Sequence, residues 1–196
     1  MKNWRRFANN PVLFKSVAIM NKTATPSELA AAIRNVPDFP KPGIQFKDIT
    51  PVLADPMLFA SSIEHLVANI APGSVSTVVG IDARGFIFGA AAALKLGAGF
   101  VPIRKKGKLP YQTFEESYEL EYGSNTVAIH IDAVRPGDRV LVIDDLLATG
   151  GTAQAAAKLL NRIGAEIVEI VFLVELAFLN GRSRLEGFPV RSLIVY

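Results

Sequence analysis

The chain has 196 residues, half of them hydrophobic and none of them cysteine, and its formal net charge is +3. This length allows one α/β domain with a hydrophobic core. The lack of cysteine excludes disulfides, thiolate metal sites and a cysteine nucleophile, and it fits a reducing compartment such as the cytoplasm. No run of about 18 uncharged apolar residues occurs, so the sequence offers no membrane-spanning helix.

The basic character of the chain belongs to its N-terminal segment. Residues 1–19 hold four basic residues and no acidic one, so residues 20–196 carry a net charge of −1. This distribution argues against a nucleic-acid-binding face. The segment has some features of a transit peptide, and Met20 is an alternative start. We therefore expect a basic, disordered extension at 1–19 and a single domain at 20–196.

Folding signals begin at Thr25, which forms a capping box with Glu28 and predicts a helix that runs to about residue 34. Residues 39–43, Phe-Pro-Lys-Pro-Gly, predict a rigid turn. Residues 57–70 predict an amphipathic helix that a Pro-Gly pair ends.

The rest of the chain alternates strands with helices. Strands are expected at 77–81, 99–103, 139–143 and 166–173, helices at 86–95 and 152–163, and an edge strand at 190–195. Between them, 107–117 predicts a long loop, and 119–122 with 126–131 a small hairpin. This alternation predicts a mainly parallel twisted sheet with helices on both faces. Ligands of such sheets bind at the carboxyl ends of the strands.

The most informative motif is V-L-V-I-D-D-L-L-A-T-G-G-T, residues 140–152. Its glycines let the backbone approach a ligand, and a helix start offers unpaired N–H groups to an anion such as a phosphate. Asp144 and Asp145 are acceptors that suit the vicinal hydroxyls of a ribose. A simple helix cap needs fewer of these residues, and neither a P-loop nor a dinucleotide glycine pattern is present. The motif therefore predicts a ribose-phosphate site.

Residues 140–152 resemble the phosphoribosyl-pyrophosphate motif of type I phosphoribosyltransferases. Residues 39–51, 80–89, 103–110 and 120–123 are similar, in the same order, to segments of the adenine-specific members of this family. The resemblance implies a type I phosphoribosyltransferase fold with a small N-terminal hood at about 20–50 and a flexible lid loop. It also implies a cytoplasmic homodimer in purine salvage, with no nucleic-acid or membrane partner.

The reaction that the resemblance implies is transfer of ribosyl-5-phosphate from phosphoribosyl pyrophosphate to adenine, giving AMP and pyrophosphate. Mg²⁺ would accompany the substrate without direct protein ligands. Asp144 and Asp145 would hold the ribose hydroxyls, and the 5-phosphate would be bound by Ala148, Thr149, Gly150, Gly151 and Thr152.

The resemblance also assigns the pyrophosphate and base sites. The pyrophosphate residues would be Asp82, Ala83, Arg84, Arg104 and Lys108, with a cis peptide between Asp82 and Ala83. The adenine residues would be Gln45, Phe46, Lys47 and Leu146, and the catalytic residues Glu121, Arg84 and Arg104. Arg84 is expected at a helix start, where a cation is disfavoured by roughly 0.3–1 kcal/mol unless an anion binds.

Two residues that the 6-oxopurine enzymes of this fold use are absent from this chain. The 6-oxopurine relatives have an aspartate where this chain has Ala148, and they use a lysine after the motif, whereas no lysine follows Lys158. Both absences favour adenine. A 6-oxopurine or pyrimidine enzyme of the same fold and a non-catalytic regulator that senses phosphoribosyl pyrophosphate remain alternatives.

Overall fold

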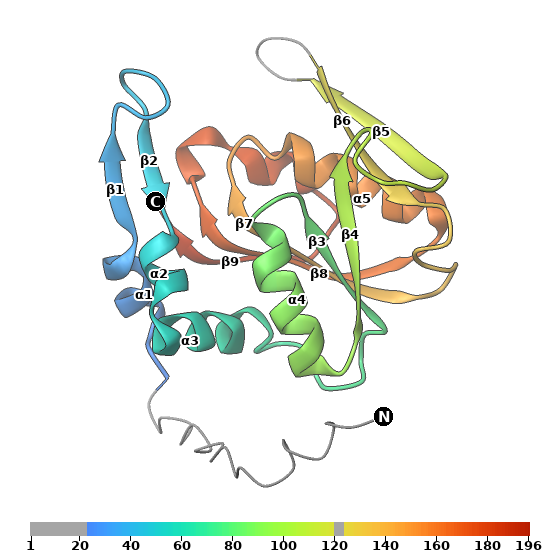
Figure 1. Cartoon of the computed structure of the whole chain (residues 1–196), viewed down its shortest axis with the longest axis horizontal. Coiled ribbons are helices and arrows are strands. Elements are labelled where there is room, and N and C mark those ends of the chain that lie inside the picture. The colour runs from blue at the N-terminus through green and yellow to red at the C-terminus, as the bar shows by residue number, and fades with distance from the viewer. Residues whose placement is uncertain (1–22, 120–123) are drawn as a thin grey trace, which may run out of the picture.

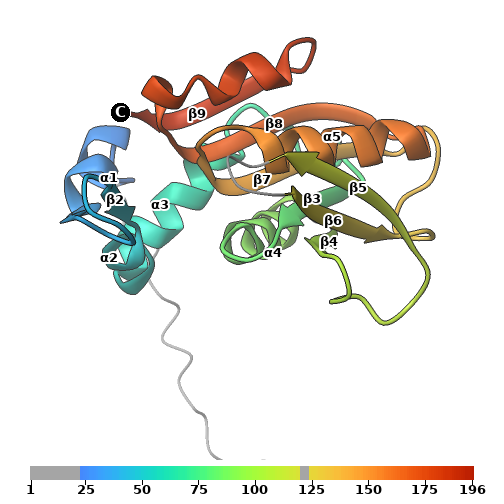
Figure 2. The same ribbon diagram turned by 90° about the horizontal axis from the view of Figure 1, so that it is seen from above.

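The computed structural model describes residues 23–119 and 124–196 of the chain. The extension predicted at 1–19 and the acid/base candidate Glu121 lie outside the described residues. Among the described helices, none is long and apolar enough to cross a membrane. The N-terminal elements α1 (Pro26–Ala32), β1 (Arg34–Pro37) and β2 (Gln45–Asp48), which form the hood, lie at one end of the molecule. The hairpin of β5 (Thr113–Glu119) and β6 (Ser124–His130) lies at the other end (Figures 1 and 2).

A seven-stranded sheet in the order β5-β6-β4-β3-β7-β8-β9 forms the centre of the fold. Five neighbouring strands, β4, β3, β7, β8 and β9, are mutually parallel, while β6 is antiparallel to both of its neighbours, β4 and β5. The strands are β3 (Thr77–Ile81), β4 (Gly99–Lys105), β5 (Thr113–Glu119), β6 (Ser124–His130), β7 (Arg139–Leu147), β8 (Glu166–Glu175) and β9 (Val190–Val195). The mainly parallel sheet predicted from the sequence is confirmed, with β9 at one edge.

Helices cover both faces of this sheet, and the strands divide their side chains between them. Leu141 and Ile143 of β7 pack in the cluster of α3 (Pro56–Leu66) and α4 (Gly85–Leu96). Val140 and Val142 pack in the opposite cluster, with α5 (Gly151–Ile163). This alternation of buried residues is the pattern of a strand buried on both faces.

The N-terminal elements differ in part from the prediction. The capping box of Thr25 and Glu28 is confirmed, but α1 (Pro26–Ala32) ends early because β1 (Arg34–Pro37) begins there. This strand pairs antiparallel with β2 (Gln45–Asp48) across the predicted rigid turn. The short α2 (Thr50–Ala54) then leads into α3, which ends at Leu66 instead of residue 70.

The prediction of a loop over 107–117 is wrong from residue 113 onward, because β5 begins there and pairs with β6 along its whole length. Phe114 and Tyr118 lie on one face of β5 and pack against the α5 side of the core. Glu116 lies between them and forms an ion pair with Lys158 of α5. Because this charged residue stands between two aromatic residues on the same face, the sequence lacks the alternation of apolar and polar residues that predicts a strand.

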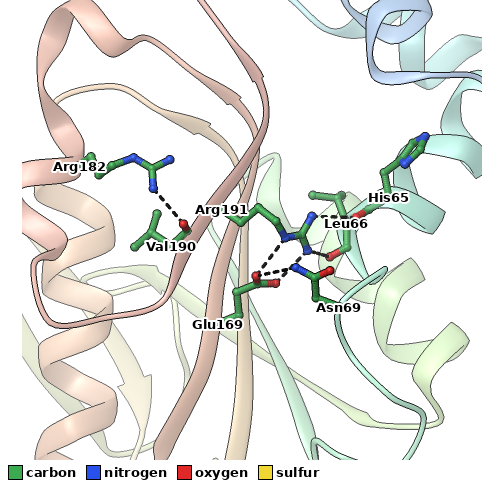
Figure 3. A network of polar contacts seen from close by, with 7 residues as sticks. All are labelled: His65, Leu66, Asn69, Glu169, Arg182, Val190 and Arg191. Atoms are coloured by element: carbon green, nitrogen blue, oxygen red, sulfur yellow. Dashed lines mark hydrogen bonds and ion pairs between the residues drawn. The ribbon is translucent and has the colours of Figure 1, made fainter.

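A polar network joins the end of α3 to β8 and β9 (Figure 3). The Arg191 guanidinium donates to the backbone carbonyls of His65 and Leu66 at 2.9 and 2.8 Å. It also forms two hydrogen bonds with the Glu169 carboxylate, at 3.0 and 2.8 Å. Because the last carbonyls of a helix lack internal partners, this arginine completes the end of α3.

We expect Arg191→Met to lower the free energy of unfolding by roughly 2 kcal/mol, because it removes two hydrogen bonds to the Glu169 carboxylate and two to carbonyls at the end of α3. Urea denaturation measures this loss. The control is Lys95→Met, which removes the exposed pair with Glu64 and should cost no more than about 1 kcal/mol. Equal losses in the two variants would contradict the role given to Arg191.

Candidate active site

The predicted ribose-phosphate motif lies at the carboxyl end of β7, where a cavity of about 80 Å³ is lined by Asp144 and residues 146–153. The strand is longer than the predicted 139–143, because Asp144 and Leu146 still pair with β8. The two carboxylates therefore stand on a part of β7 that β8 still holds. A site on a rigid strand keeps its side chains aimed at a fixed point.

The loop between β7 and α5 approaches its neighbours very closely. Gly150 has φ +80° and precedes the first residue of α5. A Cβ on Gly150 would lie 2.3 Å from the carbonyl oxygen of Gly181, and one on Gly151 would lie 2.8 Å from the Tyr118 ring. Gly150 excludes a side chain because its neighbour is backbone, and Gly151 excludes one as long as the Tyr118 ring keeps its place. A helix start of this kind offers unpaired N–H groups to an anion, and Gly150, Gly151 and Thr152 line the cavity.

Asp145 is a buried carboxylate, 5% exposed, and the Arg84 guanidinium lies 2.8 Å from its Oδ2. This ion pair lacks hydrogen-bond geometry, and no donor within the described part of the chain hydrogen-bonds to Oδ2. Asp144 accepts a hydrogen bond from the Asp145 backbone N–H at 2.9 Å. The pair therefore keeps an unsatisfied buried acceptor, which a hydroxyl donor of a ligand would satisfy.

Both carboxylates are harder to ionise than ordinary aspartates. Burial, followed by repulsion from the Asp145 carboxylate, raises the pKa of Asp144 well above the ordinary aspartate range. Burial also raises the pKa of Asp145, and the Arg84 guanidinium opposes this rise. Two neighbouring acids at a strand end whose pKa values are raised by burial are typical of a functional site.

The raised pKa of Asp144 predicts a pH-dependent gain of stability in Asp144→Asn. A group whose pKa is raised by folding contributes stability below its unfolded pKa, and this contribution is lost as pH rises through its folded pKa. The melting temperature of the variant minus that of the parent should therefore increase from acid to neutral pH. Calorimetry over this range measures the difference. A constant or falling difference would contradict the assignment.

The pyrophosphate candidates gather at the ends of β3 and β4. The cis peptide expected between Asp82 and Ala83 is confirmed, and Arg84 occupies the cap position of α4. The Arg104 guanidinium lies 3.2 Å from Asp82 and donates to the Lys108 carbonyl at 2.9 Å. Arg84 and Arg104 are thus both paired with carboxylates, and the pair with Asp145 joins Arg84 to the motif at the end of β7.

The base candidates are only partly brought together. The Arg84 guanidinium lies 5.5 Å from the centre of the Phe46 ring. This contact joins the hood to the pyrophosphate loop. Lys47 instead lies 3.8 Å from the Tyr196 ring, and Gln45 accepts a hydrogen bond from Asn35. Because side chains alternate along a strand, Gln45 and Lys47 project from the face of β2 opposite Phe46. Leu146 lines the cavity.

Gly181 and Tyr118 lie at the site and were not singled out from the sequence, whereas Gly85 belongs to the predicted pyrophosphate loop. A Cβ on Gly85 would lie 2.7 Å from Asp144 Oδ1, and one on Gly181 would lie 2.1 Å from the Ala148 carbonyl oxygen. The Tyr118 hydroxyl lies 2.9 Å from the Thr152 hydroxyl. Gly85 belongs to the segment 80–89 that carried the resemblance, so the sequence pointed to it as a site residue. Gly181 and Tyr118 had no such signal, because their partners are distant in the sequence.

A strand-end carboxylate pair, a glycine-rich helix start and a facing arginine loop on this fold define a phosphoribosyltransferase. A family model described as "Phosphoribosyl transferase domain" matches residues 49–186. The chain is 60% identical over 166 residues to the adenine phosphoribosyltransferase of Acidothermus cellulolyticus, which covers 85% of this chain and 94% of the relative. It is 53% identical over 176 residues to that of Rhizobium meliloti, covering 89% and 98%.

Solved structures agree with these relatives. Adenine phosphoribosyltransferase from Rhodothermus marinus has a TM-score of 0.83 and 55% identity, covering 87% of this chain and 98% of that one. The Saccharomyces cerevisiae enzyme, solved in complex with adenine and an imino-altritol bisphosphate, has a TM-score of 0.81 and 42% identity, covering 86% and 97%. The chain belongs to the adenine phosphoribosyltransferase family.

Proposed function

We propose that this chain transfers the 5-phosphoribosyl group of phosphoribosyl pyrophosphate to N9 of adenine, giving AMP and pyrophosphate in purine salvage. Family membership supports the reaction. The single observation that carries it is the buried, unsatisfied Oδ2 of Asp145 beside the glycine-rich start of α5. A ribose hydroxyl next to a phosphate supplies the donor and the anion that these two features require.

In this proposal each group of residues holds one part of the substrates. The segment 148–152 binds the 5-phosphate, and Asp144 and Asp145 fix the ribose so that its C1 faces N9. Arg84, Arg104, Lys108 and the 82–83 peptide bind the departing pyrophosphate. Fixed charges of this kind lower the barrier by orienting the reactants and stabilising charge that develops in the transition state.

The adenine site is proposed at Phe46 and Leu146, whose apolar surfaces suit the two faces of a purine ring. Gln45 and Lys47 would reach the edge of the ring only by leaving their partners Asn35 and Tyr196. Glu121 remains the proposed acid/base group. Incubation with labelled adenine, hypoxanthine and guanine tests the choice of base. Label should appear in AMP alone, and equal use of a 6-oxopurine would contradict the adenine assignment.

Mg²⁺ is proposed as a partner of the substrate. Within residues 23–119 and 124–196, no group of three or more His, Cys, Asp or Glu side chains is arranged to hold a metal ion. Mg²⁺ keeps several waters and prefers phosphate oxygens, so we expect it to arrive on the pyrophosphate group of the substrate. When bound, Mg²⁺ neutralises charge on the leaving pyrophosphate, while Arg84 and Arg104 orient it.

We further propose that the protein is a cytoplasmic homodimer. Each chain would have a separate extension at 1–19 and one domain at 20–196. This domain would include the hood at about 20–50 and a lid after β4. Exposed apolar side chains on α4, Ile87 and Leu94, support a contact between two copies. The basic run after Arg104 supports a lid that contacts the pyrophosphate.

Arg84→Ala should raise the KM for phosphoribosyl pyrophosphate about tenfold, because one charge-assisted contact contributes roughly 1.5–3 kcal/mol. The KM for adenine should change less, although Arg84 also lies near Phe46. Steady-state kinetics with each substrate varied in turn measure the two constants. An unchanged KM for phosphoribosyl pyrophosphate would contradict the role of Arg84.

A further inference from the structure

Tyr118, near the end of β5, lies against the first turn of α5. Its hydroxyl is 2.9 Å from the Thr152 hydroxyl. Its ring faces the backbone of Gly151 so closely that an added Cβ would lie 2.8 Å from the ring Cδ2 atom. The side chain is half-buried and packs against the α5 side of the core. One residue thus contacts both of the last two positions of the 5-phosphate segment.

The hydrogen bond to Thr152 fixes the direction of a hydroxyl that the proposed site uses. In a helix, a threonine side chain divides between two rotamers. Here the Thr152 hydroxyl donates to the Tyr118 hydroxyl, which selects the rotamer with Oγ1 toward Tyr118 and leaves the Tyr118 proton for a further acceptor. A phosphate oxygen at the start of α5 is an acceptor in the right place.

Packing alone does not hold the Tyr118 ring. A cavity of about 180 Å³ adjoins it, lined by Ser117, Tyr118, Glu119, Gln154, Ala155, Lys158 and Arg184. This cavity, which reaches α5 at Gln154, Ala155 and Lys158, leaves room for a second position of the ring. The bond to Thr152 therefore keeps the ring over Gly151 instead of in the cavity.

We propose that Tyr118 is a positioning residue of the 5-phosphate site, which acts through the Thr152 hydroxyl and the backbone of Gly151. This inference rests on the proposed function, because it takes the start of α5 as the phosphate site. It predicts that the Tyr118 hydroxyl affects binding of the ribose phosphate and leaves adenine binding unchanged.

The test compares Tyr118→Phe, Thr152→Val and the double variant in binding of ribose 5-phosphate by calorimetry and in the KM for phosphoribosyl pyrophosphate. Tyr118→Phe should weaken both three- to tenfold, as expected for one lost hydrogen bond. The KM for adenine and kcat should stay within twofold. In the Thr152→Val background, Tyr118→Phe should have no further effect, because the bond is already absent.

The control is Ser74→Ala, which removes a hydroxyl that donates to the Ala71 carbonyl at 2.7 Å in the turn before β3. It should match the parent chain in every measurement. Equal effects of Tyr118→Phe in the parent and Thr152→Val backgrounds would overturn the proposal, as would unchanged binding of ribose 5-phosphate. A parent chain that binds ribose 5-phosphate but does not use adenine would contradict the proposed reaction and leave the Tyr118 test valid.

Discussion

Asp145→Asn is expected to lower kcat about 100-fold while the melting temperature changes by no more than about 3 °C. The kinetic loss follows because Asp145 Oδ2 is a buried acceptor without a hydrogen-bond donor in the described chain, ready for a ribose hydroxyl. An amide in its place offers one acceptor fewer and presents N–H groups to a hydroxyl donor. The ribose would then be misplaced relative to adenine.

The stability of this variant should change little because two electrostatic effects oppose each other. The substitution removes the 2.8 Å ion pair with Arg84, and it also removes the repulsion that helps to raise the pKa of Asp144. Steady-state kinetics and calorimetry measure the two outcomes on the same preparation. Asp132→Asn, at an exposed position, is the matched control and should alter neither. Comparable losses of kcat and stability would contradict the assignment of Asp145 to the substrate.

Gly181→Ala should lower kcat/KM for phosphoribosyl pyrophosphate about 100-fold, because displacement of reacting groups by about 1 Å has this effect. A Cβ on Gly181 would lie 2.1 Å from the Ala148 carbonyl oxygen and 2.9 Å from the Gly150 backbone nitrogen. Both neighbours are backbone atoms of the 5-phosphate segment, so the loop itself must move. Arg182, which follows, is held by two hydrogen bonds to Glu175 and cannot easily shift the other way.

A second glycine offers a matched control for this substitution. Gly99 also has an ordinary φ, and a Cβ there would meet its nearest atom at 3.6 Å, an ordinary contact distance. Gly99→Ala should therefore keep the parent kcat/KM. Steady-state kinetics with phosphoribosyl pyrophosphate varied compare the two variants. If Gly181→Ala also retained the parent value, the close approach of the two loops would not define the phosphate site.

The sequence predicted those elements whose signals are local. The strand 77–81 is exact because five consecutive buried residues form it, and the Thr25 capping box lies within four residues. The motif 140–152 placed the two carboxylates and the glycine-rich turn correctly because strand, acids and helix start are contiguous. For the same reason, the helix that follows the motif begins within one residue of its predicted start.

Other features were hidden because their causes are distant in the sequence. The strand β5 depends on pairing with β6 and on the Glu116–Lys158 ion pair, which no local pattern reveals. The contact of Gly181 with Ala148 joins residues that only the packed β7–β8 region brings together. The pairing of Arg84 with Asp145 likewise joins the start of α4 to β7, which lie together only in the folded sheet.

Release of pyrophosphate in the presence of phosphoribosyl pyrophosphate and Mg²⁺, measured with and without adenine, tests the central proposal most directly. We expect rapid release of pyrophosphate that requires adenine and is matched by an equal amount of AMP. In Asp145→Asn this release should be about 100-fold slower. Release that does not depend on adenine, or that persists unchanged in Asp145→Asn, would contradict the proposal.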